Sequence, residues 1–138
     1  RDCAFWPKEG QPAVRGAALR DLYASVDVVI GDSCFAGSPK GAYYWSDRIP
    51  ETLGRGGYLL HPDVVGLSDH YPVPMGPVTW EAGDWDHLGS LVESSLALPA
   101  SERQAINRLN RQWVIEHDTY EVRVQQLVDL LTERELLK

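Results

Sequence analysis

The segment YYWSDRIPETLGRGGYLLHPD (residues 43–63) places a helix start, a glycine turn and a strand in direct succession. Ser46 is a typical N-cap residue, and the sequence predicts a short helix behind it that ends at about Leu53. Pro50 is compatible with this helix because it falls near the first turn. Three glycines at 54–57 then end the helix, and the apolar run YLLHP that follows is typical of a short strand. The segment therefore predicts a helix–turn–strand corner of an α/β core.

The flanking sequence extends this corner into an open parallel sheet. VDVVIGD (residues 26–32) is a run of β-branched residues with almost no alternation, which is typical of a strand covered on both faces. VTWEAG (residues 78–83) predicts a third strand, after a loop rich in Pro and Gly at residues 66–77. One helix is predicted before the first strand, at residues 17–25, and three helices follow the third strand. This order is typical of an α/β fold, which we expect to form a single domain over residues 1–138.

The three C-terminal helices are predicted from their caps and their apolar stripes. Asp84 or Asp86 is expected to cap the helix at 84–98, and Ser101 with Gln104 is expected to form a capping box for the helix at 101–117. The last helix begins at Asp118 or Thr119. The residues expected to form the core-facing stripes are Leu88, Leu91, Val92 and Leu96, then Ile106, Leu109 and Trp113, and finally Tyr120, Val124, Leu127, Val128 and Leu131.

The composition argues against several classes of protein. With 138 residues and a formal charge of −7, the chain is long enough for a core and is unsuited to general binding of nucleic acid or anionic membrane. Cys3 and Cys34 have no metal-ligand spacing and are typical of reduced thiols in a cytosolic protein. The sequence contains neither a transmembrane-length apolar run nor a signal peptide, so we expect a cytoplasmic location. Because RDCAFWPKEG begins without Met or a clear element, we also expect a fragment of a longer protein.

Ligand binding is expected beyond the carboxyl ends of the strands, as in other open α/β sheets. The first strand leads through a glycine-containing loop into the helix start at Ser46, where free N–H groups and the positive dipole end favour a phosphate. Lys40 and Arg48 would add charge-assisted contacts. Glu51, one turn into the helix, suits a vicinal diol such as a ribose, or it is simply a glutamate near the positive helix end. Tyr43 and its aromatic neighbours either face a base or sugar or pack in the core.

Common catalytic motifs are not found in the sequence. There is no Walker loop and no G-x-G-x-x-G after a strand. GDSCF at residues 31–35 is the only serine-centred candidate elbow, and it leaves a hydrolase that uses Ser33 as a minor alternative. The four histidines show neither HExxH nor paired spacing, so no metal site is predicted.

Residues 19–131 resemble the C-terminal part of a glycosyltransferase with the GT-B fold, in particular the group 1 type and its spore-maturation, CgeB-like relatives. The resemblance rests on an R-x-x-E-x-L-x-x-G helix, an acidic G-D-x-x-x-L helix start and an H-x-T-Y-x-x-R element. Here these motifs consist of Arg48, Glu51, Leu53 and Gly56, of Gly83, Asp84 and Leu88, and of His117, Thr119, Tyr120 and Arg123. The resemblance implies a Rossmann-like open parallel sheet flanked by helices, with a helical C-terminal tail.

The resemblance also implies a substrate, a nucleoside-diphosphate sugar, with no other cofactor and no bound metal. In the family, the glutamate that matches Glu51 binds the donor ribose, and groups near the helix start hold the diphosphate. The positions that match this second role are Ser33, Lys40, Ser46 and Arg48. Tyr43 departs from the pattern, because many relatives carry a second glutamate there, close to the donor sugar. The acceptor is unknown, and its domain is expected upstream of the sequence.

Two features of the resemblance leave other interpretations open. The element from His117 to Arg123 is interpreted as structural, with Arg123 capping or pairing locally. Because Tyr43 replaces a family glutamate, the chain can also be a non-catalytic Rossmann-like module for binding or assembly. The hydrolase that uses Ser33 is the least favoured alternative. No catalytic residue is assigned in any of these cases.

Overall fold

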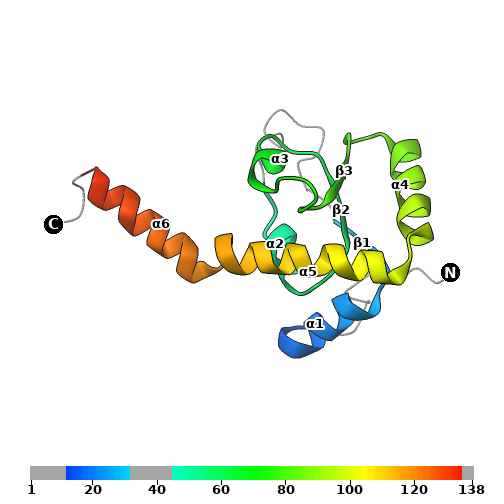
Figure 1. Cartoon of the computed structure of the whole chain (residues 1–138), viewed down its shortest axis with the longest axis horizontal. Helices are drawn as coiled ribbons and strands as arrows, with labels where there is room; N and C mark the ends of the chain where they lie inside the picture. The colour runs from blue at the N-terminus through cyan, green and yellow to red at the C-terminus, as the bar shows by residue number, and fades with distance from the viewer. Residues whose placement is uncertain (1–11, 32–44, 135–138) are drawn as a thin grey trace.

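The computed structural model describes residues 12–31 and 45–134, and Figure 1 shows how their elements are arranged. In chain order the elements are α1 (Gly16–Ser25), β1 (Val29–Ile30), α2 (Arg48–Gly54), β2 (Leu59–Pro62), α3 (Leu67–His70), β3 (Val78–Trp80), α4 (Trp85–Ala97), α5 (Ala100–His117) and α6 (Tyr120–Glu133). In the described residues the strands form one parallel sheet in the order β1-β2-β3. The predicted α/β class with a small open parallel sheet and flanking helices is therefore confirmed.

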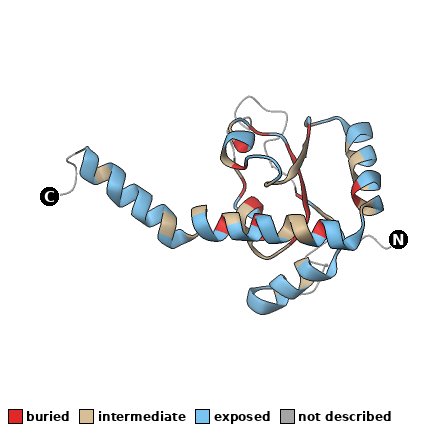
Figure 2. Ribbon diagram, in the orientation of Figure 1, coloured by how far each residue is buried: buried red, intermediate tan, exposed pale blue. Residues whose placement is uncertain are grey.

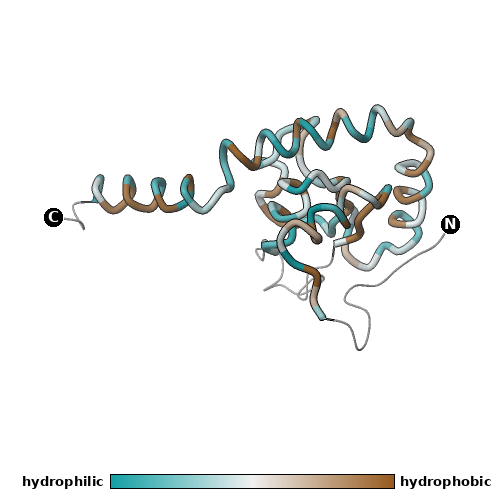
Figure 3. Tube along the Cα trace, turned by 90° about the horizontal axis from the view of Figure 1, so that it is seen from below, coloured by the Kyte–Doolittle hydropathy of each residue, from teal (hydrophilic) through white to brown (hydrophobic). Residues whose placement is uncertain are grey.

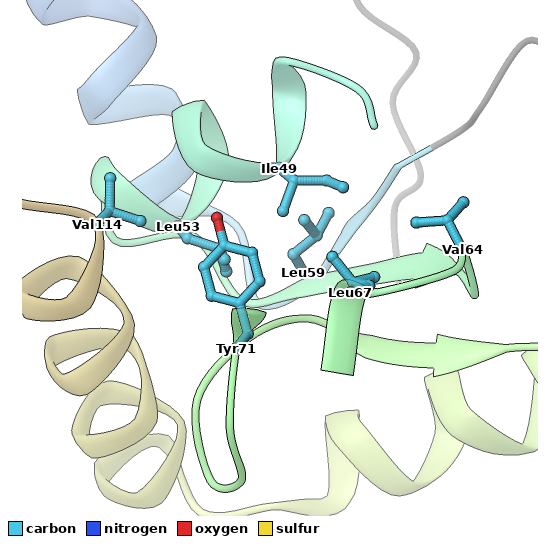
Figure 4. Packing of buried hydrophobic residues seen from close by; sticks show 7 residues of the cluster. All are labelled: Ile49, Leu53, Leu59, Val64, Leu67, Tyr71 and Val114. Carbon is cyan, nitrogen blue, oxygen red and sulfur yellow. The ribbon is translucent and has the colours of Figure 1, made fainter. Parts of the chain in front are cut away.

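Strand β2 is the centre of the sheet, and its alternating side chains serve two cores. Leu59 belongs to a cluster under α2, α3 and the C-terminal half of α5, which Figure 4 shows at close range. Leu60 points to the opposite face, where it joins Trp80 and Tyr58 under α4. Every residue of β2 is buried, so this strand is covered on both faces. The sheet is thus the middle layer between helices.

One close approach fixes how β1 meets β2. Gly31 donates its backbone N–H to Leu60 O at 2.8 Å, directly after the end of β1. A Cβ atom at Gly31 would lie only 2.8 Å from Cδ2 of His61 and 3.1 Å from Cδ1 of Leu59. Only a residue without a side chain fits between these two groups, so glycine is required here for packing.

Two buried polar side chains on α5 tie this helix to neighbouring segments. Arg103 donates to Ser95 O at 3.0 Å and to Leu98 O at 2.6 Å, which satisfies carbonyls at the end of α4. The same guanidinium donates to Asp27 at 2.6 Å, just before β1. Asn110 accepts from Gly76 N at 2.8 Å and holds the loop before β3 against the helix. These bonds fix the α4–α5 corner beside the sheet.

Helix α6 continues from the end of α5 and extends away from the sheet, as both Figure 1 and Figure 3 show. Its caps agree with the sequence, because Thr119 accepts a hydrogen bond from Val122 N. The predicted core-facing stripe, however, is wrong in the described structure. Tyr120 is 87% exposed, and Val124, Leu127 and Val128 are also exposed, as the pale blue ribbon in Figure 2 shows. The 3.6-residue pattern predicted the helix correctly but not a partner for it.

Several local predictions also need correction. Strand β1 is shorter than predicted for residues 26–32, and it is not covered on both faces as predicted. Ile30 is 54% exposed, and β1 lies at the edge of the described sheet. The predicted loop at 66–77 contains the single turn α3, which has too few residues to show a periodic pattern. Helix α5 begins at Ala100 after Pro99 with no side-chain cap in the described structure, so the capping box at Ser101 is wrong. On the same helix Leu109 is exposed, whereas Val114 faces the core. The cap of α4 by Asp84 is confirmed.

Candidate functional site

The start of α2 brings together two of the residues that the sequence singled out. The helix begins at Arg48, after Asp47 in the N-cap position. Ser46 is buried, and its Oγ accepts a hydrogen bond from Arg48 N at 3.3 Å. The predicted capping role of Ser46 is thus met one residue earlier than the formal N-cap. Arg48 itself is exposed at the beginning of the helix.

Glu51 lies one turn further along α2, and its carboxylate is already engaged. Glu51 Oε1 accepts from Arg55 at 3.2 Å, one helical turn later. Arg55 also donates to Gly16 O at 3.0 Å and so joins α2 to the start of α1. The Glu51 side chain is still 37% exposed, so part of the carboxylate faces solvent. Ion pairs of this exposure contribute little to stability, about 0.3–0.5 kcal/mol.

Three of the predicted site residues, Ser33, Lys40 and Tyr43, lie outside the described residues. The geometry of the predicted phosphate site therefore rests on Ser46, Arg48 and Glu51.

A second polar cluster, which the sequence did not predict, surrounds Asp118 at the end of α5. The Asp118 side chain is only 3% exposed. It accepts hydrogen bonds from His70 Nε2 at 2.8 Å, from Tyr71 Oη at 2.6 Å, and from the Arg123 guanidinium. A buried carboxylate needs such donors, because its desolvation otherwise costs several kcal/mol. We call these four residues the Asp118 cluster; it joins α3, α5 and α6.

The Asp118 cluster strongly perturbs Tyr71. Burial of the phenol raises the pKa of Tyr71 far above its ordinary value of 10.0, and the hydrogen bond to Asp118 and the charge of Asp118 act in the same direction. The positive charge of Arg123 opposes this rise only partly. Tyr71 therefore stays a neutral hydrogen-bond donor to Asp118 throughout the physiological range.

Aromatic rings connect the Asp118 cluster to the start of α2. The Trp45 ring lies 5.3 Å from the His70 ring and 6.4 Å from the Tyr71 ring, measured between centroids. Trp45 Nε1 donates to Val65 O at 3.1 Å, in the loop after β2. The ring of Trp113, on α5, also lies near His70, with 6.3 Å between the two centroids. His70 thus has aromatic neighbours from both the segment that leads into α2 and the C-terminal half of α5.

Sequence reasoning missed most of these residues because they are distant along the chain. His70 and Tyr71 meet Asp118 from 48 and 47 positions away, and no spacing rule predicts such a contact. The one available signal was the H-x-T-Y-x-x-R element, for which a structural role and local pairing of Arg123 were predicted. The predicted local pairing is confirmed, because Arg123 pairs with Asp118. The pairing of Glu51 with Arg55 has the i, i+4 spacing of helical ion pairs and was also readable from the sequence.

The described residues contain no group of three or more His, Cys, Asp or Glu side chains that could hold a metal ion. Asp84 and Asp86 have the Asp-x-Asp spacing, but Asp84 accepts from His87 N at 2.9 Å as the cap of α4. Within the same ranges, no helix has the length and apolarity that crossing a membrane requires.

The chain was compared with family models, with curated proteins and with solved structures, and none of the three comparisons finds a match.

Proposed function

We propose that the chain is the donor-binding domain of a GT-B glycosyltransferase, with a Rossmann-like sheet, and that it binds a nucleoside-diphosphate sugar. The observation that carries the proposal is the position of α2. This helix begins beyond the carboxyl end of β1, and its first turn contains Arg48 and Glu51 in the order of the family motif, with Ser46 just before it. Ligands of open α/β sheets bind at this edge. We expect the enzyme to act in the cytoplasm, together with an acceptor domain.

In the proposed reaction, an acceptor hydroxyl attacks the anomeric carbon of the sugar. The bond from that carbon to the diphosphate breaks, the new glycosidic bond forms, and the acceptor hydroxyl transfers its proton to the departing diphosphate. The nucleoside diphosphate leaves with the electron pair of the broken bond. The positive dipole end of α2 and the Arg48 guanidinium would stabilise this developing negative charge. The protein thus contributes electrostatic stabilisation and alignment rather than a covalent intermediate.

The Glu51–Arg55 ion pair favours one alternative, a non-catalytic module for binding or assembly. In that case Glu51 acts only by joining α2 to Arg55 and, through it, to α1. The two proposals differ in what the carboxylate does. In a donor site it binds the ribose, and Arg55 merely orients it, whereas in a non-catalytic module the ion pair is its whole role.

Nucleotide binding by two variants of the chain distinguishes these two proposals. Isothermal titration of the 138-residue chain with UDP and with GDP should give binding for at least one nucleotide. Glu51→Gln should weaken it about ten- to a hundredfold, because a charge-assisted hydrogen bond contributes about 1.5–3 kcal/mol. Arg55→Gln, which removes the same ion pair but keeps the carboxylate, should change it less than about threefold. Glu93→Gln, an exposed glutamate on α4, is the matched control.

Two results would refute the donor-site proposal. One is that neither UDP nor GDP binds to the chain. The other is that Glu51→Gln and Arg55→Gln weaken binding to the same extent, since the carboxylate would then matter only as the partner of Arg55.

A further inference from the structure

The His70–Asp118 pair fixes which nitrogen of the His70 ring carries the proton. His70 Nε2 lies 2.8 Å from Asp118 Oδ1, and the same carboxylate accepts from Tyr71 and Arg123. A carboxylate that receives three donors can only accept, so Nε2 of the neutral ring carries its hydrogen. The other nitrogen, Nδ1, is therefore unprotonated and presents a lone pair.

That lone pair is open to a ligand. Within residues 12–31 and 45–134, the polar contacts of the His70 ring are all made by Nε2, which donates to Asp118 at 2.8 Å. The Arg123 guanidinium lies 3.4 Å from Nε2, but it can only donate and is therefore a neighbour of the protonated nitrogen and not its hydrogen-bond partner. The side chain is 23% exposed, so the ring is not sealed within the core. His70 thus combines a fixed tautomer with an acceptor that its protein neighbours leave free, which is the same device that orients the histidine in catalytic triads.

The position of His70 places this acceptor at the same sheet edge as the start of α2. Helix α3 follows the carboxyl end of β2, and Trp45, the residue before Ser46, packs its ring 5.3 Å from that of His70. Trp45 and Trp113, which pack against the core, are aromatic neighbours of the imidazole. A hydrogen-bond acceptor beside aromatic rings suits a sugar, which has apolar C–H faces and donating hydroxyls.

We propose that His70 Nδ1 accepts a hydrogen bond from a hydroxyl of the transferred sugar, and that Asp118 is the positioning residue that holds the imidazole in this tautomer. The inference rests on the proposed function, because it assigns the sugar half of the same donor site. It also supplies a polar sugar contact in a chain that has Tyr43 where many relatives have a glutamate.

The binding of sugar nucleotides, compared with the binding of the same nucleotides without sugar, distinguishes this role of His70 from a structural one. The variant His70→Gln keeps an N–H donor at the place of Nε2 and removes the acceptor at Nδ1. By isothermal titration it should weaken binding of UDP-glucose or GDP-mannose about three- to tenfold, the effect of one neutral hydrogen bond. Binding of UDP or GDP alone should not change. His87→Gln, on α4 at the opposite face of the sheet, should change neither.

The wild-type chain gives a second measurement that does not depend on the folding of a variant. Nitrogen-15 NMR of the His70 ring should show a protonated Nε2 and an unprotonated Nδ1. The Nδ1 resonance should move when UDP-glucose or GDP-mannose is added, and not with UDP or GDP. A protonated Nδ1, or an Nδ1 resonance that responds equally to nucleotide and sugar nucleotide, would overturn the role of His70 and leave nucleotide binding intact. If no nucleotide binds with or without sugar, the proposed function fails, and the role of His70 fails with it.

Discussion

The hydroxyl of Tyr71 offers the sharpest test of the Asp118 cluster. Tyr71→Phe keeps the ring in the core but leaves Asp118 with one donor fewer. A hydrogen bond to a charged acceptor contributes about 1.5–3 kcal/mol, so the free energy of unfolding at pH 7 should fall by about that amount. Tyr120→Phe is the matched control, because Tyr120 is 87% exposed, and it should change stability by less than about 0.5 kcal/mol.

The raised pKa of Tyr71 adds a pH dependence with a definite sign. Above pH 10 the unfolded chain loses the phenolic proton, whereas the folded chain keeps it because its pKa is higher. The folded state then binds more protons than the unfolded state, so stability falls as pH rises, by up to about 1.4 kcal/mol per pH unit. The contribution is fully present below pH 10. Tyr71→Phe removes this slope, and its deficit should therefore shrink by about 1.4 kcal/mol between pH 7 and pH 11.

Urea unfolding followed by circular dichroism at pH 7 and at pH 11 measures both effects. Comparison with the wild type gives the contribution of Tyr71 to the pH dependence of stability, because all other titrating groups are common to the two chains. Equal stability losses for Tyr71→Phe and Tyr120→Phe at pH 7 would contradict the hydrogen bond to Asp118. A Tyr71→Phe deficit that does not change with pH would contradict the raised pKa.

Three further substitutions and one control test single contacts of the fold, each by urea unfolding. Gly31→Ala should lower the free energy of unfolding by about 1–3 kcal/mol, because its Cβ meets His61. The control Gly89→Ala, on α4 with open space around it, should raise the free energy of unfolding by up to about 1 kcal/mol. Equal effects of the two substitutions would contradict the close approach at Gly31. Arg103→Met should cost about 1–3 kcal/mol, because carbonyls at the end of α4 lose their donor, and an unchanged unfolding midpoint would show that water replaces it. Asp84→Ala should lower the free energy of unfolding by about 1 kcal/mol through the lost cap of α4. An unchanged free energy of unfolding would show that this cap does not stabilise the helix.

The sequence predicted features that depend on near neighbours in the chain. The strand at β2, the Asp84 cap of α4 and the polar start of α2 are all local patterns, and each is present in the structure. The apolar stripe of α6 predicted a helix correctly, but whether Tyr120 or Leu127 is covered depends on a partner surface, which no periodicity encodes.

The candidate site could be predicted only in part for the same reason. Ser46, Arg48 and Glu51 are close together in the chain, so their common place on α2 followed from the motif. His70 and Asp118 meet only because α3 and the end of α5 pack together, and that packing depends on the whole fold. Helix α3 itself consists of one turn, too short for its apolar residues to repeat.

The close approach at Gly31 also explains how the sheet finds its register. Because β2 is apolar on both faces, a slip along β1 would still bury hydrophobic side chains, and hydrophobicity alone cannot choose among alignments. The missing side chain at Gly31 can select one alignment, because the His61 ring fits beside the neighbouring strand only at this position. A slip by one residue that set Ile30 at this position would place a side chain in that space and drive the ring out. The alignment of the first two strands thus depends on the missing Cβ of Gly31, which leaves room for the imidazole of His61.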